Sequence, residues 1–182
     1  MDTVDGVFRE RVATEPDTPF VTCGGDWLTF AELDERSDRL ATGLARLGVR
    51  RGDHIASILP NRIETVEFLL AVAKLGAVQV PLNYFLKGDF LGYQLSDCGA
   101  KFLIADGPGY EAAAGLLGGT AIAATVQVDE GAGGDVVYPE LFGERDTFEP
   151  ASRPGDLLTI MYTSGTTAVA KGCMLSTGYF VS

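Results

Sequence analysis

Basic residues are scarce in this chain of 182 residues. Lys and Arg number 14 against 25 Asp and Glu, which gives a formal net charge of −11 at pH 7. Phosphate backbones are held mainly by clustered Lys and Arg, so this balance argues against a nucleic-acid partner. We expect an acidic surface and no nucleic acid among the partners.

Long apolar runs are also missing. No stretch reaches the roughly 18 consecutive apolar residues that a membrane-spanning helix needs. The first twenty residues mix Asp, Glu and Arg into a short amphipathic pattern, unlike the apolar core of a signal peptide. The sequence therefore predicts no membrane span and a cytoplasmic location.

Cysteine and histidine are too few for a metal site or a disulfide framework. Cys23, Cys98 and Cys173 are odd in number and lack metal-ligand spacing, so we expect reduced thiols. His54 is the only histidine, and it opens an apolar run with no acidic or cysteine cluster beside it, which favours a structural role. The spacing of Glu64 and Glu67 indicates charge on a helix surface.

Apolar periodicity predicts a helix, a hairpin and a second helix in the first 48 residues. Val4, Val7, Phe8 and Val12 repeat at helical spacing, and short apolar runs then flank a turn at Gly24-Gly25-Asp26. Thr29 and Glu32 have the spacing of a capping box, and Gly48 supplies a stop for the helix that follows.

From residue 50 onward, apolar runs alternate with helical patterns. Extended runs are expected at 54–59, 77–82, 101–105 and 121–128, helices at 62–75 and 90–97, and a turn at 106–109. The small-residue segment 112–124 indicates a peripheral helix and an edge strand. This order predicts an α/β fold with an open, mostly parallel sheet flanked by helices.

Loop composition divides the chain into three parts. Residues 143–154 are rich in polar residues, Gly and Pro, and a new strand is expected at 157–162. We therefore expect an α/β subdomain at 1–142, a linker at 143–156, and at 157–182 a strand, a loop and the start of a second subdomain.

The segment after that strand has the composition of a polyphosphate site. Successive backbone N–H groups, four hydroxyls and one lysine can together hold phosphate oxygens. The spacing differs from the common mononucleotide P-loop, because Ala170 precedes the lysine and Gly172 follows it. A solvated turn is the alternative on composition alone. The candidate binding residues are Thr163, Ser164, Gly165, Thr166, Thr167 and Lys171.

Four stretches in the right order resemble the adenylate-forming superfamily, which contains acyl-CoA synthetases, luciferases and peptide-synthetase adenylation domains. Thr163-Ser-Gly-Thr-Thr followed by Lys171-Gly172 is similar to the signature loop of that family. Trp27-Leu-Thr-Phe-Ala-Glu-Leu33 and Leu75-Gly-Ala-Val-Gln-Val-Pro-Leu-Asn83 resemble its first two core motifs. Asp97-Cys-Gly-Ala-Lys101 looks like a further helix-to-strand passage of the family.

The resemblance implies the N-terminal part of the large domain of an AMP-forming acyl-CoA ligase. Such an enzyme joins a small carboxylic acid to ATP with release of pyrophosphate, and the thiol of coenzyme A then displaces AMP. The hydroxyl residues and Lys171 would hold the β- and γ-phosphates beside Mg²⁺, with Lys171 in phosphate binding and not in acid–base work. The resemblance places no catalytic residue and no metal ligand in this chain.

Two other functions remain open at this point. Pro81-Leu-Asn83 resembles acyl-CoA ligases, whereas adenylation domains that load an amino or aryl acid onto a carrier protein more often carry Asp at position 83. A non-catalytic nucleotide-binding or interaction module is the alternative of another class.

Two loop positions and the length depart from the family pattern. The family usually has Gly at Ala168 and often Pro at Ala170; Ala in a left-handed conformation costs roughly 1 kcal/mol. The family's adenine, ribose and acyl contacts, its metal-binding glutamate and its catalytic lysine lie beyond Ser182. We therefore expect a truncated enzyme that is inactive alone.

Overall fold

The computed structural model describes residues 3–129, 131, 133–146, 148, 152–163 and 170–182. Within these residues the chain forms a seven-stranded sheet in the order β7-β6-β5-β3-β4-β8-β9. Every neighbouring pair in it is parallel except β8 and β9. The strands are β3 (His54–Ile58), β4 (Val78–Pro81), β5 (Phe102–Ala105), β6 (Ala124–Gln127), β7 (Val136–Val137), β8 (Leu157–Thr163) and β9 (Lys171–Ser176).

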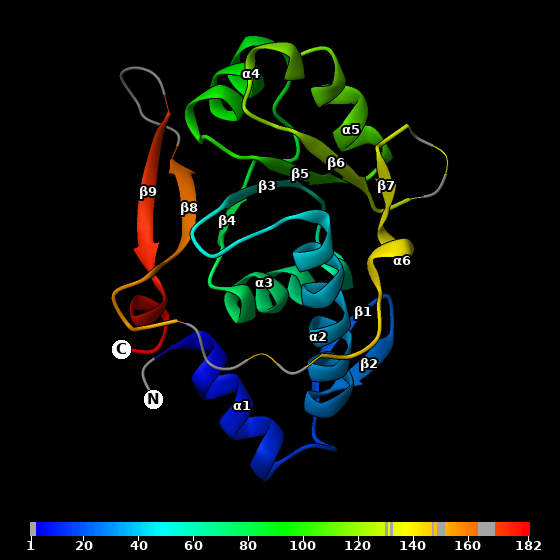
Figure 1. Ribbon diagram of the computed structural model, residues 1–182, viewed down its shortest axis with the longest axis vertical. Coiled ribbons are helices and arrows are strands. Elements are labelled where there is room, and N and C mark those ends of the chain that lie inside the picture. Colours follow the sequence, from blue (N-terminus) through cyan, green and yellow to red (C-terminus); the bar gives the residue numbers. More distant parts are fainter. Residues whose placement is uncertain (1–2, 130, 132, 147, 149–151, 164–169) are drawn as a thin grey trace.

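Helices cover both faces of the sheet, which confirms the predicted α/β class (Figure 1). One face packs on α2 (Phe30–Leu47), α3 (Ile63–Leu75) and α6 (Tyr138–Leu141). The other face packs on α4 (Gly88–Asp97), α5 (Gly107–Ala114) and the 3-10 turn η1 (Leu117–Gly119). Because both faces are covered, the strands are apolar on both sides, as a parallel sheet requires.

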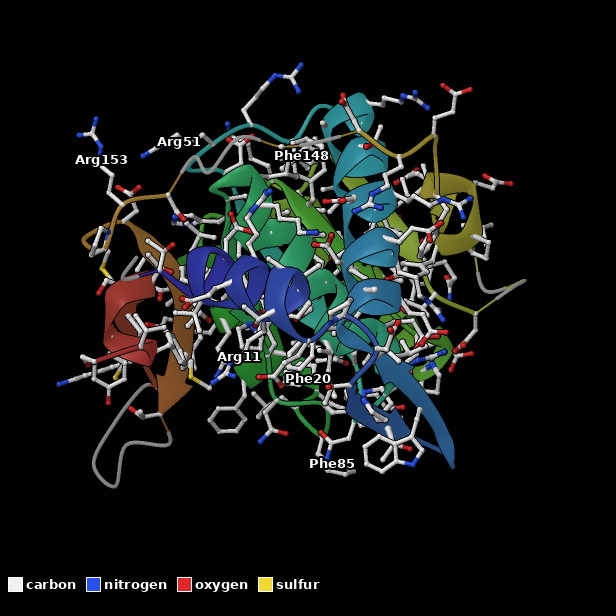
Figure 2. The ribbon with its side chains drawn as sticks, turned by 90° about the horizontal axis from the view of Figure 1, so that it is seen from below. Arg11, Phe20, Arg51, Phe85, Phe148 and Arg153 are labelled. Atoms are coloured by element: carbon white, nitrogen blue, oxygen red, sulfur yellow. The ribbon has the colours of Figure 1, made fainter. Side chains whose placement is uncertain are left out.

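The N-terminal elements pack outside this layered core. Helix α1 (Val4–Thr14) and the antiparallel hairpin of β1 (Pro19–Cys23) and β2 (Asp26–Thr29) form a small aromatic cluster with α2 and α3. In it, the rings of Phe20 and Phe30 stack with centroids 4.4 Å apart. Figure 2 shows α1 crossing in front of the helices that cover the sheet. The second 3-10 turn, η2 (Thr177–Phe180), follows β9.

The predicted boundaries of the second helix are confirmed in detail. Thr29 and Glu32 form the reciprocal capping box, in which the Thr29 hydroxyl accepts from the Glu32 N–H and the Glu32 carboxylate accepts from the Thr29 N–H. Gly48 ends the helix at φ 108°, a left-handed conformation that glycine adopts without strain.

A buried cluster of charges joins α2, α3 and the segment that leads to β8. The Lys74 side chain is fully buried and donates to the carboxylates of Asp34 at 2.7 Å and Asp38 at 2.6 Å. Arg145 donates to the other oxygens of the same two carboxylates, at 2.7 and 2.9 Å. Full compensation of the buried charges explains why the fold tolerates them.

Three predictions about local structure were wrong. Residues 106–109 begin α5 and do not form a turn, because the Asp106 carboxylate caps the helix by accepting from the Gly109 N–H and Pro108 fits its first turn. Glu67 is buried and not a surface charge; it accepts from the Tyr138 hydroxyl at 2.9 Å and pairs with Arg36. Strand β6 is not at the edge, since β7 pairs outside it.

None of the helices in the described part of the chain has the length and apolar content needed to cross a bilayer.

Candidate functional site

The two ends of the candidate phosphate loop, Thr163 and Lys171, lie in the antiparallel hairpin of β8 and β9. Thr163 and Lys171 stand opposite each other as the last cross-strand pair, so they close the hairpin just below the connecting residues 164–170. The Thr163 hydroxyl reaches only to 3.5 Å from the Lys171 carbonyl oxygen, a weak contact. Ser164, Gly165, Thr166 and Thr167, with Ala168, lie outside the described residues, so two of the six candidate residues are placed.

Lys171 is exposed, and its side chain makes no ion pair with any described residue. It is also the only charged side chain between residues 157 and 182, in a chain whose net charge is −11. An ammonium group without a carboxylate nearby is free to meet a phosphate oxygen. The structure therefore leaves the predicted phosphate lysine available.

Strand β9 was missed by the sequence analysis, which predicted a loop through Lys171 and then the start of a second subdomain. The signal for it is the short apolar run of Cys173, Met174 and Leu175 directly after Gly172. Because β9 pairs with β8 over six positions, the ends of the loop are held by strands on both sides. The loop therefore leaves and re-enters an ordered hairpin.

The stem below the tip contains a tyrosine that sequence patterns alone did not single out. The Tyr162 hydroxyl donates to the Asp97 carboxylate at the end of α4, at 2.6 Å. Tyr162 is cross-strand partner to Gly172. Partial burial, together with the Asp97 carboxylate, raises the pKa of the Tyr162 phenol, so it stays protonated as a donor.

A second place in the fold has the general geometry of a ligand site. Strands β3 and β5 are neighbours, but the helices that follow them, α3 and α5, lie on opposite faces of the sheet. Ligands of open α/β sheets bind in the crevice at the carboxyl ends of such a pair of strands. We call this place, formed by the residues that follow Ile58 and Ala105, the switch-point crevice.

The chain fills the switch-point crevice with its own groups. Asp106 accepts from the Gly109 N–H and from the Tyr84 hydroxyl, both at 2.8 Å. Asp129 accepts from the Gly107 N–H at 3.1 Å and from Arg62 at 3.0 Å. The donors at the α5 N-terminus are therefore already satisfied, as they would be by a bound anion.

Close packing also narrows the switch-point crevice. A Cβ atom on Gly109 would lie 2.6 Å from the carbonyl oxygen of Ile58, so only glycine lets α5 approach β3 this closely. Partial burial would raise the pKa of the Asp129 carboxyl, but hydrogen bonds from the Gly107 N–H and Arg62 lower it overall. The crevice is thus a structural junction of carboxylates and their donors.

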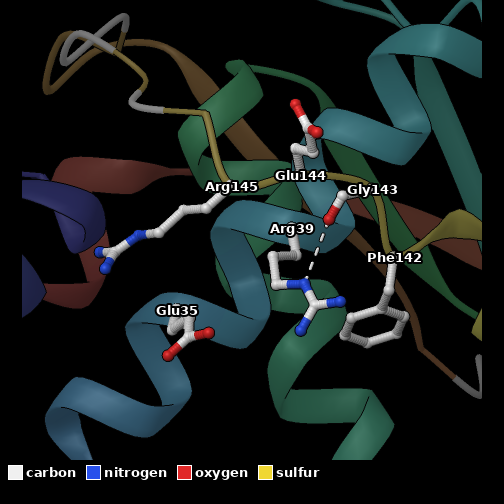
Figure 3. A pocket seen from close by; sticks show the side chains of 6 residues that line it. All are labelled: Glu35, Arg39, Phe142, Gly143, Glu144 and Arg145. Carbon is white, nitrogen blue, oxygen red and sulfur yellow. Dashed lines mark hydrogen bonds between the residues drawn. The ribbon is translucent and has the colours of Figure 1, made fainter.

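A surface groove of about 500 Å³ lies between α2 and the segment after α6 (Figure 3). In it, the Arg39 guanidinium donates to the Gly143 carbonyl at 3.1 Å and lies 5.9 Å from the Phe142 ring centroid. Arg145, on its rim, already binds Asp34 and Asp38. These cations hold the linking segment on α2, which assigns the groove a structural role. It is lined by Glu35, Arg39, Phe142, Gly143, Glu144 and Arg145.

The described residues contain no group of three or more His, Cys, Asp or Glu side chains arranged for a metal ion. The ring nitrogen Nδ1 of His54 lies 2.7 Å from the Cys98 carbonyl oxygen, which agrees with the predicted structural role. Cys23, Cys98 and Cys173 are free thiols. Residues 157–182 include no Asp or Glu, so this segment offers Mg²⁺ no carboxylate ligand.

Comparisons with known proteins agree on one family. A family model described as AMP-binding enzyme matches residues 8–182. Feruloyl-CoA synthase of an Amycolatopsis species is 39% identical over 171 residues, which are 92% of this chain and 32% of that protein. Surfactin synthase subunit 3 of Bacillus subtilis (strain 168) is 34% identical over 168 residues, which are 91% of this chain and 12% of that protein.

A solved structure shares the fold over nearly the whole chain. The protein, assigned as a long-chain-fatty-acid CoA ligase from Rhodopseudomonas palustris CGA009, superposes with a TM-score of 0.89 at 28% identity. The match covers 96% of this chain and 44% of that one. The chain therefore spans less than half of the length of each relative described here.

Proposed function

Because this chain belongs to the AMP-binding enzyme family, we propose that its β8–β9 tip holds the β- and γ-phosphates of ATP during the activation of a carboxylic acid. The acid would attack the α-phosphate to give an acyl-adenylate and pyrophosphate, and the thiol of CoA would then displace AMP. The chain spans about a third of the length of feruloyl-CoA synthase, so this full reaction is proposed for the enzyme and not for these residues alone.

One observation carries the proposal: Lys171 stands exposed, unpaired among the described residues, at the closing pair of the hairpin. Negative charge increases on the departing pyrophosphate, and a fixed cation with hydroxyl and N–H donors stabilises it most where no carboxylate competes. Thr163, opposite Lys171, supplies a hydroxyl at the same level of the hairpin. Ser164, Gly165, Thr166 and Thr167 remain predicted contacts.

The residues of the hairpin do not by themselves make a magnesium site. Segment 157–182 lacks carboxylates, and Mg²⁺ binds mainly to oxygen ligands, including substrate phosphates. We therefore infer that the ion would enter with the ATP phosphates and that any protein carboxylate for it lies outside this segment. The magnesium requirement and a cytoplasmic location remain predictions from the sequence.

Binding of nucleotides to the chain tests the phosphate contact directly. In calorimetric titrations, we expect Mg·ATP to bind saturably in the micromolar range and inorganic tripolyphosphate to compete with it. AMP, which lacks the β- and γ-phosphates, should bind far more weakly. Equal affinity for AMP and ATP would contradict a phosphate contact at the tip, and no binding of any of the three would favour a non-catalytic interaction module.

The acceptor of the acyl group is a second question, since relatives include feruloyl-CoA synthase and a subunit of surfactin synthase. The residue at position 83 is weak evidence for either acceptor, CoA or a carrier-protein thiol. The Asn83 side-chain oxygen accepts from the Phe85 N–H at 2.9 Å, a local turn contact that an Asp carboxylate makes equally well. We keep CoA as the proposed acceptor, with a carrier-protein thiol as the alternative.

Pyrophosphate exchange separates these two acceptor classes. An active preparation that contains this chain is incubated with ATP, labelled pyrophosphate and panels of fatty, aryl and amino acids. Exchange stimulated by fatty or aryl acids, followed by CoA thioester formation, supports the ligase. Exchange that depends on amino acids, without a CoA thioester, supports an adenylation domain that loads a carrier protein.

A further inference from the structure

The upper part of strand β8 has little support from the sheet. Within the described residues, β8 pairs with β4 at a single position, Gln79 opposite Thr159. Ile160 still packs in the core beside Val78 and Val80 of β4, but residues 161–163 are more exposed, and β8 and β9 continue toward the level of α4 (Figure 1). The end of the stem that carries the tip therefore depends on β9 and on contacts outside the sheet.

The side chain of Tyr162 makes one such contact. It lies one cross-strand pair below Thr163 and Lys171, and its hydroxyl donates to Asp97 Oδ2 at 2.6 Å. The bond links the stem to the last residue of α4, 65 positions earlier in the chain. Hydrogen bonds to a charged acceptor are among the strongest that side chains make.

The residue opposite Tyr162, Gly172, lies in a crowded part of the hairpin. A Cβ atom on Gly172 would lie 2.8 Å from Ile160 Cγ2 and 3.5 Å from Tyr162 Cζ. Ile160 and Tyr162 thus occupy the space beside Gly172, and only glycine leaves that space free. Glycine is therefore required here by Ile160, while the Tyr162 ring lies at ordinary contact distance beside it.

Asp97 is poorly placed for its own helix. A carboxylate at the C-terminus of a helix lies at the negative end of the helix dipole, and no basic residue in the last turn of α4 offsets it. Residues that oppose their local structure often serve a contact elsewhere. Here the Asp97 carboxylate accepts from the Tyr162 hydroxyl and also interacts with the Tyr93 phenol of its own helix.

We propose that Tyr162 and Asp97 are positioning residues for the phosphate contact, because their bond fixes the hairpin stem against α4 and thereby the placement of Thr163 and Lys171. This inference rests on the proposed binding of ATP phosphates at the tip. Neither residue touches the nucleotide; both act through the cross-strand pair above them. The same effect is expected for ATP and for inorganic tripolyphosphate.

Four variants of the chain test the pair. Tyr162→Phe keeps the ring and removes the donor, and Asp97→Ala removes the acceptor. Asp97→Asn keeps an oxygen that can accept from the hydroxyl, so it serves as the conservative rescue. Tyr179→Phe is the matched control, since Tyr179 is exposed and its hydroxyl makes no hydrogen bond with any of the residues that the structure describes.

The first measurement is affinity for Mg·ATP and for tripolyphosphate. Tyr162→Phe and Asp97→Ala should each weaken both by about fivefold, as expected for one charge-assisted hydrogen bond in a partly exposed site. The double variant should be no weaker than either single one. Asp97→Asn and Tyr179→Phe should remain within about twofold of the unsubstituted chain.

The second measurement is amide hydrogen exchange of the stem, which requires no nucleotide. Tyr162→Phe should speed exchange in residues 160–163 and 171–174 and leave β3 and β5 unchanged. Unchanged affinity and unchanged exchange in Tyr162→Phe would overturn the positioning role while leaving ATP binding intact. Failure of the unsubstituted chain to bind ATP and tripolyphosphate would instead overturn the proposed function, and the positioning role with it.

Discussion

The switch-point crevice and the β8–β9 tip both have features of an anion site, yet they differ in which of their polar groups are already bonded. In the crevice, the N–H groups of Gly107 and Gly109 point to Asp129 and Asp106, and Arg62 pairs with Asp129. At the tip, Lys171 has no ion-pair partner among the described residues. Topology alone would predict ligand binding in the crevice, whereas the lysine that remains without an ion-pair partner favours binding at the tip.

The proposed phosphate contact at the tip would place the ligand of this α/β fold away from the usual edge of the sheet. At the α5 N-terminus, carboxylates of the chain itself take the place that a bound anion would have. In segment 157–182, Lys171 is the only charged side chain, so no carboxylate of that segment neutralises it. The crevice should therefore govern stability and the tip should govern nucleotide affinity. Substitutions in each region test this separation of stability from nucleotide affinity.

The largest effect is expected from Asp106→Ala in the crevice. It removes the cap of α5 and leaves the Tyr84 hydroxyl without its acceptor, which should lower the free energy of unfolding by about 2 kcal/mol. Urea unfolding measures this, with Asp106→Asn as the control that keeps a side-chain acceptor. If Mg·ATP affinity fell as well under conditions where the variant is folded, the crevice would belong to the nucleotide site.

The next effect is expected from Lys171→Met at the tip. Loss of the point charge should weaken Mg·ATP binding by about tenfold, equal to about 1.4 kcal/mol, while the free energy of unfolding stays within about 0.5 kcal/mol. Lys87→Met is the matched control, because Lys87 is exposed too and lies at the start of α4. Equal loss in both variants, measured by calorimetry, would point to the overall charge of the protein and not to the tip.

A gain of affinity is expected from Ala168→Gly, which restores the residue typical of the family. Position 168 lies outside the described residues, so this prediction comes from the resemblance alone. If the bound loop needs a left-handed residue there, glycine should tighten Mg·ATP binding by up to about fivefold, or about 1 kcal/mol. Ala170→Gly, which adds flexibility at a position where the family often has Pro, should not produce the same gain.

The smallest effect concerns acid conditions in the crevice. The folded state lowers the pKa of Asp129 below its ordinary value of 3.8, so its ionised form stabilises the fold above that value, and this contribution is lost as pH falls through the lowered pKa. The pair with Arg62 is partly exposed and screened, so we expect only about 0.5 kcal/mol. Between pH 7 and 3, the free energy of unfolding should change less in Asp129→Asn than in the unsubstituted chain. An identical pH dependence in the two proteins would contradict this role of Asp129.

Most of the fold follows from local patterns. The capping box of α2, its glycine stop and the alternation of strands and helices were predicted because each depends on residues close in sequence. Glu67 was misjudged because its partners, Arg36 and Tyr138, come from other elements, and helical spacing does not show which face is covered. The turn predicted at 106–109 failed because Asp, Pro and Gly also suit the first turn of a helix.

The candidate site was predictable only where a motif named its residues. Thr163 and Lys171 were identified from the loop, and the family resemblance is confirmed over residues 8–182. The contacts around the ends of the loop were not predictable. The Tyr162–Asp97 hydrogen bond joins residues 65 positions apart, and the sequence of β9, which brings Gly172 beside Tyr162, has only a short apolar run to indicate a strand. Such contacts appear only when the chain is folded.

The glycine opposite Tyr162 has a consequence for how the loop can change in length. Sliding β9 by one residue would bring the side chain of Lys171 or Cys173 to the place of Gly172, where Ile160 leaves no room for a Cβ atom, so the observed alignment of the strands is favoured over its neighbours. That alignment leaves the seven positions 164–170 to connect Thr163 with Lys171. We therefore expect an added or deleted residue to be absorbed within those positions, because a shift of β9 at Gly172 would press a side chain against Ile160.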